Sequence, residues 1–463
     1  MIKQLSNKID FGFILYGSII SLFSLILLIQ FPYKSYLILP GITISLVAIY
    51  IVWRNINVLY YAFFILSVLY FDTGDGITFT DSIYLSITLL IIANLGIYLV
   101  SNFGNTLKTP LDKSFLALYV VLFYGLILGI IYGNPLFEVA AELTRYLPVF
   151  GYFFFRDLMT VEKRKSIFLS LLFVIILFVI ARNFYFYREI IIQSTAIWQT
   201  ESARVPVNEV IVLLGTVVFI VFASLYAKKS IAIVCLLLFG ASFISLILTQ
   251  SRGYWLAFLI SSIAMLFLAN GKSKIRIIIY GLVLLSTITA VVAIFFQDSL
   301  ELIIDGLLKR VGTLGNVGMD SSLQDRYRET KVVLDKIFQN PIAGHGFGTT
   351  FRREAIRPRA IYIGPLSFIH NGYLTVWFKF GIVGLGVFLA FCYQILQFSR
   401  QFYLEKTKQF PKLLYLTIFA TTSGMLIVNI TSPQFYQFDG IFLFTFFSAL
   451  ISSELIKNQP ELN

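Results

Sequence analysis

Two histidines, His345 and His370, lie in one long polar segment of an otherwise apolar chain. The segment spans residues 297–371 and is flanked by long apolar runs. Histidine is the side chain best suited to accept a proton near neutral pH, so either residue is a candidate general base. A lone histidine where polar and apolar sequence meet is more often a structural hydrogen-bonding group, so its neighbours must decide between the two interpretations.

The same segment is rich in cations between residues 326 and 359. They are Arg326, Arg328, Lys331, Lys336, Arg352, Arg353, Arg357 and Arg359, against the acids Glu329, Asp335 and Glu354. A guanidinium group binds phosphate oxygens with two parallel hydrogen bonds, so this stretch is a candidate site for a pyrophosphate or an anionic glycan. For any single arginine, contact with lipid headgroups is the simpler alternative.

Metal and thiol chemistry have weaker support. Cys235 and Cys392 lie inside apolar runs, where a thiol behaves as a small hydrophobic group, so we expect neither a disulfide nor a metal site from them. The segment FDTGDG contains Asp72 and Asp75, which could hold a divalent cation. A glycine-rich acidic segment is more typical of a turn, so we predict no metal and no other cofactor.

The elements that must position these residues are membrane-spanning helices. Hydrophobic residues make up 58% of the chain and charged residues only 13%, far from the composition of a soluble domain. Apolar runs of about 18 to 20 residues recur along the whole length, and each can cross the hydrocarbon layer as a helix. We predict an all-α, polytopic integral membrane bundle of about 14 helices, or about 12 if the shortest runs do not span.

The predicted spans are 11–29, 36–53, 58–71, 83–100, 115–132, 136–155, 167–182, 208–226, 231–249, 253–269, 277–296, 372–396, 413–430 and 438–453. They divide the chain into helices in 1–296, one large external loop at 297–371, and C-terminal helices in 372–463. The first span follows Lys3 and Lys8 without a small-residue cleavage site, so we interpret it as an uncleaved helix.

Part of the external loop has a helical pattern. The apolar residues of 321–338 recur at helical spacing, with Ser321 or Ser322 as a plausible cap; they are Leu323, Tyr327, Val333, Leu334 and Ile337. We expect Gln339, Asn340 and Pro341 to end this helix and the glycines of GHGFG, residues 344–348, to form a turn.

The distribution of cations predicts the orientation. The net charge of +12 comes mostly from lysines and arginines in alternate loops, so it indicates membrane topology and not nucleic-acid binding. The richer loops contain Lys3, Lys8, Arg54, Lys108, Lys113, Arg156, Lys163, Arg164, Lys165, Lys228, Lys229, Lys272, Lys274, Arg276, Arg400, Lys406, Lys408, Lys412 and Lys457. The short loops of the other set contain only Lys34, Arg182, Arg188, Arg204 and Arg252. Both termini are therefore predicted to be cytoplasmic and the 297–371 loop external.

Three stretches resemble the O-antigen ligase and O-antigen polymerase superfamily of bacterial envelope glycan enzymes. They are TQSRGYWLAFL at 249–259, DRYRETKVVLDKIFQNPIAGHGFGT at 325–349 and HNGYLTVWFKFGIVGLGVFL at 370–389. Their order and spacing and their common external placement carry the likeness. The first 200 residues are similar only as hydrophobic helices.

The resemblance implies a metal-independent glycosyltransferase that acts on a lipid-carried glycan. It implies that Arg252 and Arg326 hold the pyrophosphate of an undecaprenyl-linked donor, with Arg328 competing for the second role. It also implies that His370 activates the acceptor hydroxyl, and we assign His345 a supporting role in substrate binding. Paired arginines can stabilise the charge that develops on a leaving pyrophosphate without a metal.

A group of charges next to the apolar runs needs a separate explanation. Glu138, Glu142 and Arg145 share one helix face, and Lys379 lies nine residues after His370. Either Glu142 and Arg145 form an internal pair, or this face lines the donor cavity, with Arg145 as a substrate-binding residue.

We therefore expect a glycosyltransferase of the bacterial inner membrane that moves a glycan from undecaprenyl pyrophosphate to a sugar hydroxyl. The acceptor is a second lipid-linked glycan in a polymerase or a lipid A core in a ligase, and about fourteen spans favour the polymerase. Further partners are the membrane lipids and a chain-length regulator. The alternative is a transporter or flippase of the same lipid-linked sugars, but transporters show internal repeats and midplane polar residues, which are not evident here.

Overall fold

The computed structural model describes residues 56–69, 79–193, 207–226, 228–269, 271, 274–282, 321–352 and 366–458. The predicted spans at 11–29 and 36–53 lie outside these residues. So do Asp72, Asp75 and most of the predicted span at 277–296.

The described part of the chain is built from helices. They are α3 (Ile56–Leu69), α4 (Phe79–Thr106), α5 (Pro110–Ile131), α6 (Leu136–Thr144), η2 (Leu147–Gly151), α7 (Tyr152–Met159), α8 (Glu162–Gln193), α10 (Glu209–Leu225), α11 (Lys229–Leu248), α12 (Arg252–Leu268), α15 (Ser321–Gln339), α16 (Gly372–Glu405), α17 (Gln409–Val428), η3 (Gln434–Tyr436) and α18 (Phe438–Asn458). Among these residues the only β-type pairing is an isolated bridge between Phe351 and Leu366.

Seven helices of the described part are long and apolar enough to cross a membrane, namely α4, α5, α8, α11, α16, α17 and α18. α3, α10 and α12 are shorter apolar helices. In the described part of the chain the prediction of an all-helical fold with helices fit to span a membrane is confirmed, whereas the count of about 14 spans is not.

The predicted span at 136–155 is not one continuous helix. α6 ends at Thr144, the 3₁₀ helix η2 follows, and α7 begins at Tyr152. Pro148 lies at the start of η2, where its missing N–H and its ring prevent an uninterrupted α-helix. The apolar composition of the run was visible in the sequence, but the break was not predicted.

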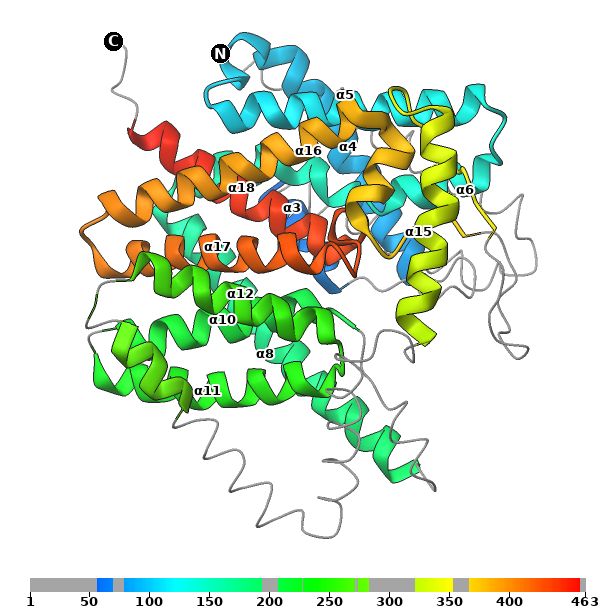
Figure 1. The fold of residues 1–463 in the computed structure, drawn as a ribbon. Helices are drawn as coiled ribbons and strands as arrows, with labels where there is room; N and C mark the ends of the chain where they lie inside the picture. Colours follow the sequence, from blue (N-terminus) through cyan, green and yellow to red (C-terminus); the bar gives the residue numbers. More distant parts are fainter. Residues whose placement is uncertain are drawn as a thin grey trace.

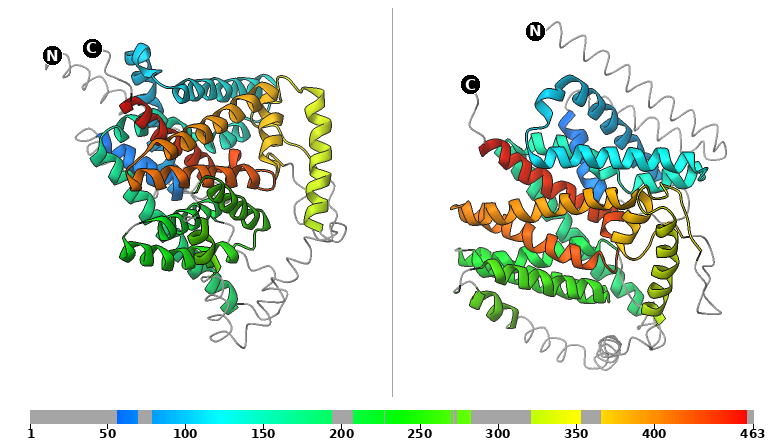
Figure 2. Two further views of the ribbon diagram at one scale, coloured as in Figure 1. Left: turned by 60° about the vertical axis from the view of Figure 1, so that its left-hand side comes forward. Right: turned by 45° about the horizontal axis from the view of Figure 1, so that its top comes forward.

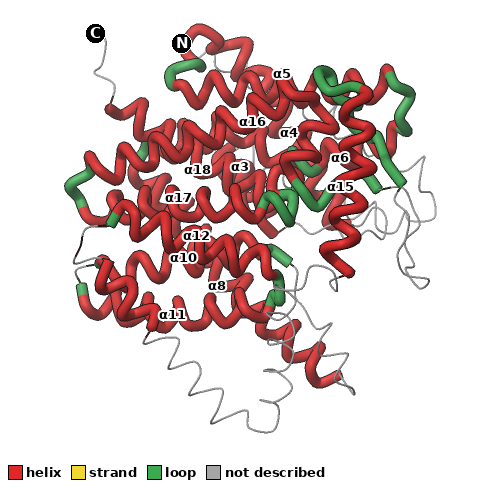
Figure 3. Tube along the Cα trace, viewed as in Figure 1, coloured by secondary structure: helices red, strands yellow, loops and turns green. Residues whose placement is uncertain are grey.

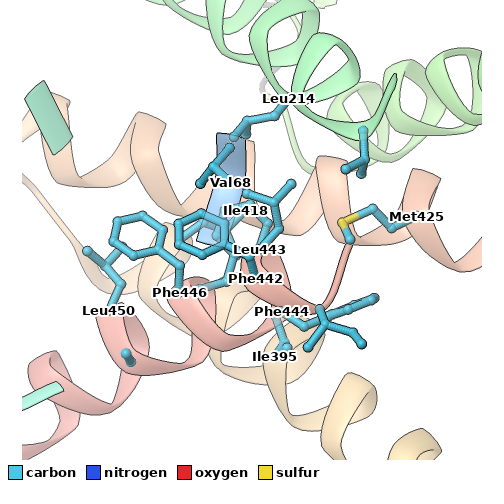
Figure 4. Packing of buried hydrophobic residues seen from close by; sticks show 14 of the residues in the cluster. Val68, Leu214, Ile395, Ile418, Met425, Phe442, Leu443, Phe444, Phe446 and Leu450 are labelled. Carbon is cyan, nitrogen blue, oxygen red and sulfur yellow. The ribbon is translucent and has the colours of Figure 1, made fainter. Parts of the chain in front are cut away.

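The long helices lie side by side, and α15 runs across one end of them (Figures 1 and 2). The loop from α5 to α6, the loop from α17 to α18 and the described parts of the segment between α15 and α16 gather at this same end (Figure 3). α18 lies in the middle of the bundle, where Phe442, Leu443 and Phe446 pack against side chains of neighbouring helices (Figure 4). Phe64 of α3 meets the rings of Phe442 and Phe446 at centroid distances of 4.9 and 5.3 Å.

Ion pairs tie together the opposite end of the bundle. Glu454 of α18 binds Lys165 of α8 at 3.2 Å and also binds Lys406, which follows α16. Lys457 binds Glu162 at the start of α8. These cations belong to the loops that the sequence assigns to one side of the membrane, so the structure brings the cation-rich loops together at the end away from α15.

Candidate active site

His370 lies at the start of α16, where the chain turns into the bundle. Asn371 is the N-cap of this helix, and its side-chain oxygen accepts hydrogen bonds from the backbone N–H groups of Tyr373 and Leu374 at 3.0 and 3.1 Å. The backbone N–H of Gly372 donates to the carbonyl of Asn429 at 2.8 Å. The cap satisfies donors that a helix start leaves unpaired, so His370 is held just outside the first turn.

The imidazole of His370 contacts a buried carboxylate that was not among the predicted site residues. Glu329 of α15 is 1% exposed, and its Oε2 lies 3.0 Å from Nδ1 of His370. The backbone N–H of His370 donates to the Glu329 Oε1 at 2.6 Å. The His370 side chain is 39% exposed, so one edge of the ring is held by the protein while the remainder faces outward.

One face of α15 packs against the start of α16 and the loop before it. Val333 and Ile337 are fully buried and pack with Phe351, Ile369 and Phe378. The predicted helix at 321–338 is therefore confirmed, and its apolar spacing identified Val333 and Ile337 correctly. Tyr327 was wrongly included in the apolar face, since its side chain is 73% exposed.

The two competing arginines of α15 differ in position. Arg326 precedes Glu329 by three residues, so both lie on the face of the helix that contacts His370. Arg326 is half-buried, whereas Arg328 is exposed on a different face. The helix therefore brings Arg326 to the His370 side and directs Arg328 away from it.

The glycine turn inserts between α5 and α16. The N–H groups of His345 and Gly346 donate to the carbonyls of Phe378 and Lys379, both at 2.9 Å. α16 is kinked immediately afterwards, because Gly381 has a φ of 68°. A side chain on Gly346, whose φ is 73°, would collide with the backbone of α5 at Gly129. The predicted turn at 344–348 is thus confirmed, and it packs against two helices.

His345 is not part of the His370 group. Its Nε2 lies 2.9 Å from the carbonyl of Lys336, seven residues along α15 from Glu329, which corresponds to about 10 Å along the helix. Burial lowers the pKa of His345 below its ordinary value. The residue lines a pocket of about 420 Å³ together with Tyr132, Asn134, Gln339, Asn340 and Thr349. The two histidines therefore occupy separate places at the α15 end of the bundle.

Glu142 pairs with Lys379 and not with Arg145. The Lys379 Nζ lies 2.6 Å from Oε1 of Glu142 and 2.6 Å from the carbonyl of Thr349, while the N–H of Gly348 donates to Glu142 Oε2 at 2.9 Å. Lys379 and Glu142 are 0% and 2% exposed. Of the two alternatives for this helix face, the pair between Glu142 and Arg145 is thus wrong.

Two aromatic side chains, Tyr436 and Phe368, connect Arg145 to His370. The guanidinium carbon of Arg145 is 4.7 Å from the ring centroid of Tyr436. Tyr436 stacks on Phe368 at 6.0 Å, and Phe368 lies 5.7 Å from the His370 ring. Arg145 remains half-buried at the end of α6, so a cation and a histidine are separated by two aromatic rings.

The loop from Asn429 to Gln437 joins Arg252 to this group. Gly253, next to Arg252, is so close to Thr431 that a side chain would collide with the threonine. Gln434 donates to the hydroxyl of Tyr254 at 2.8 Å, and the same loop provides Tyr436. This loop therefore contacts the start of α12, the start of α16 and Arg145, although none of its residues was a predicted site residue.

The structure therefore brings His370 and Glu329 together, with Arg326 on the Glu329 face of α15. The 429–437 loop connects Arg145 and the start of α12, where Arg252 lies, to the start of α16. A signal for Glu329 was present in the sequence, since an acid three residues after Arg326 must share its helix face. The 429–437 loop had no such signal, because its role depends on which helix ends are neighbours.

Residues 233–389 match a protein-family model described as O-antigen ligase. The resemblance to the O-antigen ligase and polymerase superfamily is confirmed. The comparison with curated proteins finds no match. The matched O-antigen ligase segment contains Arg252, Arg326, Glu329 and His370, whereas Arg145 and the 429–437 loop lie outside it. The family points to an integral membrane enzyme of glycan processing.

Proposed function

We propose that this protein is a metal-independent glycosyltransferase that moves a glycan from undecaprenyl pyrophosphate to the hydroxyl of an acceptor sugar. The observation that carries the proposal is the contact between His370, just before the start of α16, and Glu329 of α15, which follows Arg326 by three residues on the same helix face. A partly exposed imidazole with a carboxylate behind it and a guanidinium on the same helix face supplies a base and an anion-binding group.

In the proposed reaction the acceptor hydroxyl attacks the anomeric carbon of the donor glycan. The new bond joins the hydroxyl oxygen to this carbon, while the bond from the carbon to the pyrophosphate oxygen breaks. The hydroxyl proton passes to His370, and the bonding electrons leave with undecaprenyl pyrophosphate. A positioned imidazole contributes about 10² to 10⁴ in rate as a general base.

Arginines stabilise the negative charge that develops on the leaving pyrophosphate. Arg326 is the first candidate, because it shares the Glu329 face of α15. Arg252 at the start of α12 and Arg145 beside Tyr436 are the further candidates, because the 429–437 loop contacts both the start of α12 and Arg145. Arg328 and His345 are left with peripheral roles in substrate binding. Guanidinium groups suit this work, because they stay charged and bind phosphate oxygens in pairs.

The membrane setting follows from the cation distribution. The ion-paired end with Lys165, Lys406 and Lys457 is cytoplasmic, and α15 with the candidate site faces the outside of the bacterial inner membrane. Labelling of intact cells is expected to modify a cysteine placed at the exposed Lys331 and to spare one at the exposed Lys163. The reverse pattern would invert the orientation.

The acceptor remains either a second lipid-linked glycan or a lipid A core. The count of about fourteen spans favoured the polymerase, but this count is not confirmed. The identity of the labelled product therefore has to distinguish a polymerase from a ligase. If the product is a polymer, a chain-length regulator is a further proposed partner.

Reconstitution of the purified protein in proteoliposomes distinguishes a glycosyltransferase from a transporter. Purified protein in proteoliposomes is given radiolabelled lipid-linked glycan from the bacterium that makes it, with and without lipid A core. Longer glycans on the lipid carrier indicate a polymerase, and label on lipid A core indicates a ligase. A transporter would change the leaflet that holds the label but not the size of the labelled molecule, and this result would refute the proposed activity.

A further inference from the structure

The His370 imidazole is held at one nitrogen by a carboxylate from a different part of the chain. Both carboxylate oxygens of Glu329 lie close to Nδ1, at 3.0 and 3.2 Å. Oε1 also accepts the backbone N–H of His370 at 2.6 Å. The carboxylate thus fixes both the main chain and the side chain of the same residue, which restricts the rotation of the ring.

The burial of Glu329 determines what it can do. It is 1% exposed, although Asp335 on the same helix is exposed. An ionised carboxylate only accepts hydrogen bonds, so the Nδ1 that faces it must carry the ring proton. Nε2 is then the nitrogen with a free lone pair. Among the residues that the structure describes, none is hydrogen-bonded to Nε2, and the ring is 39% exposed.

We infer that Glu329 is a positioning residue that holds the His370 imidazole in the Nδ1–H tautomer and so presents Nε2 to the acceptor hydroxyl. This inference rests on the proposed function of His370. When Nε2 takes the hydroxyl proton, the ring becomes an imidazolium beside the Glu329 carboxylate, and the opposite charges stabilise it. Glu329 does not touch the acceptor and acts only through the histidine.

The first test measures the tautomer of His370 by ¹⁵N NMR. The chain has two histidines, so ¹⁵N-histidine labelling of the purified protein gives two imidazole rings, and the His370 signals are those lost in His370→Asn. The neutral ring of the wild-type protein is expected to show a protonated Nδ1 and an unprotonated Nε2. Glu329→Gln can also donate to Nδ1, so its spectrum is expected to show the Nε2–H form as well. An Nε2–H tautomer in the wild-type protein would overturn the inference.

The second test measures kcat and KM for glycan transfer in Glu329 variants. Glu329→Gln is expected to lower kcat for glycan transfer about 10- to 100-fold at nearly unchanged KM, less than the loss of a whole general base. Asp335→Asn, which removes the same charge from an exposed position of α15, is expected to keep wild-type turnover. Glu329→Asp is expected to recover part of the rate, because it retains the charged acceptor.

The outcomes distinguish this inference from the proposed function. If His370→Ala is inactive and Glu329→Gln transfers at the wild-type rate, the positioning role is wrong and the general base stands. If His370→Ala transfers normally, the base itself is wrong. A purely structural contact would lower the thermal midpoint in Glu329→Gln without changing the tautomer of His370, and this result would also overturn the inference.

Discussion

Lys379 of α16 and Glu142 of α6 are 237 residues apart in the sequence, yet the lysine Nζ lies 2.6 Å from the glutamate Oε1. Both side chains are buried. The same two groups bind the backbone of Gly348 and Thr349, so this pair joins the glycine turn to two helices near the candidate site.

Removal of one partner of this pair is expected to destabilise the protein. Lys379→Met leaves Glu142 as an uncompensated buried charge, which costs about 3 to 5 kcal/mol. Thermal unfolding in detergent measures the effect, with exposed Lys331→Met as the control. Addition of Glu142→Gln to Lys379→Met removes the charge and keeps an acceptor for the Gly348 N–H, so the thermal midpoint is expected to recover in part. Equal midpoints for Lys379→Met and Lys331→Met would contradict a stabilising role.

The two arginines of α15 provide a matched pair. Arg326→Lys keeps the charge but loses the paired hydrogen bonds of the guanidinium, so transfer is expected to fall about 10- to 100-fold, the equivalent of about 1.5 to 3 kcal/mol for a bond to a charged group. Arg328→Lys, on the exposed face, is expected to change transfer less than about 3-fold. The measurement is kcat/KM for the lipid-linked donor. A larger loss in Arg328→Lys than in Arg326→Lys would assign the phosphate role to Arg328.

The close approach of Gly372 to Asn429 predicts that no side chain larger than that of glycine fits at the start of α16. A methyl group at Gly372 would collide with the side-chain oxygen of Asn429, so Gly372→Ala is expected to displace the helix start, to cost about 1 to 3 kcal/mol and to lower transfer. Gly386→Ala is the control, because a Cβ at Gly386 of the same helix meets nothing within 4 Å. The account of this helix start fails if Gly372→Ala matches Gly386→Ala in both thermal midpoint and transfer.

The sequence predicted the helical membrane fold, because apolar runs long enough to span are a property of composition and length. It also predicted α15 and the glycine turn, since their signals are local: apolar spacing for Val333 and Ile337, and glycines where the φ angles are positive. Pro148, which breaks the predicted 136–155 span, was present in the sequence but was not used.

Contacts between residues distant in the sequence could not be predicted from local patterns. A pair between Glu142 and Arg145, three residues away, was one of two alternatives, and Glu142 binds Lys379 instead. Glu329 reaches His370 only because α15 crosses the end of the bundle beside α16 (Figure 1). A helical pattern defines which residues share a face, but the packing of helices decides what that face contacts.

The burial of His345 predicts an acid-sensitive contribution to stability. Its pKa is lowered in the folded protein from the ordinary value of 6.5 because of desolvation, so the unfolded chain binds more protons as the pH falls through 6.5 toward the folded value. Stability is therefore lost over this window on acidification and is unaffected by this group above it. His345→Gln is expected to flatten the dependence of the thermal midpoint on pH below about 6.5. An identical pH dependence in both proteins would show that His345 does not contribute.

Glycan transfer by His370→Ala in proteoliposomes tests the central claim most directly. The variant is expected to fold, to insert and to bind the lipid-linked donor as the wild-type protein does, because Asn371 still caps α16. Its single-turnover transfer rate is predicted to fall by about 10² to 10⁴, the contribution of a general base. Transfer at close to the wild-type rate, in a variant with the wild-type thermal midpoint and donor affinity, would contradict the role of His370 as the base.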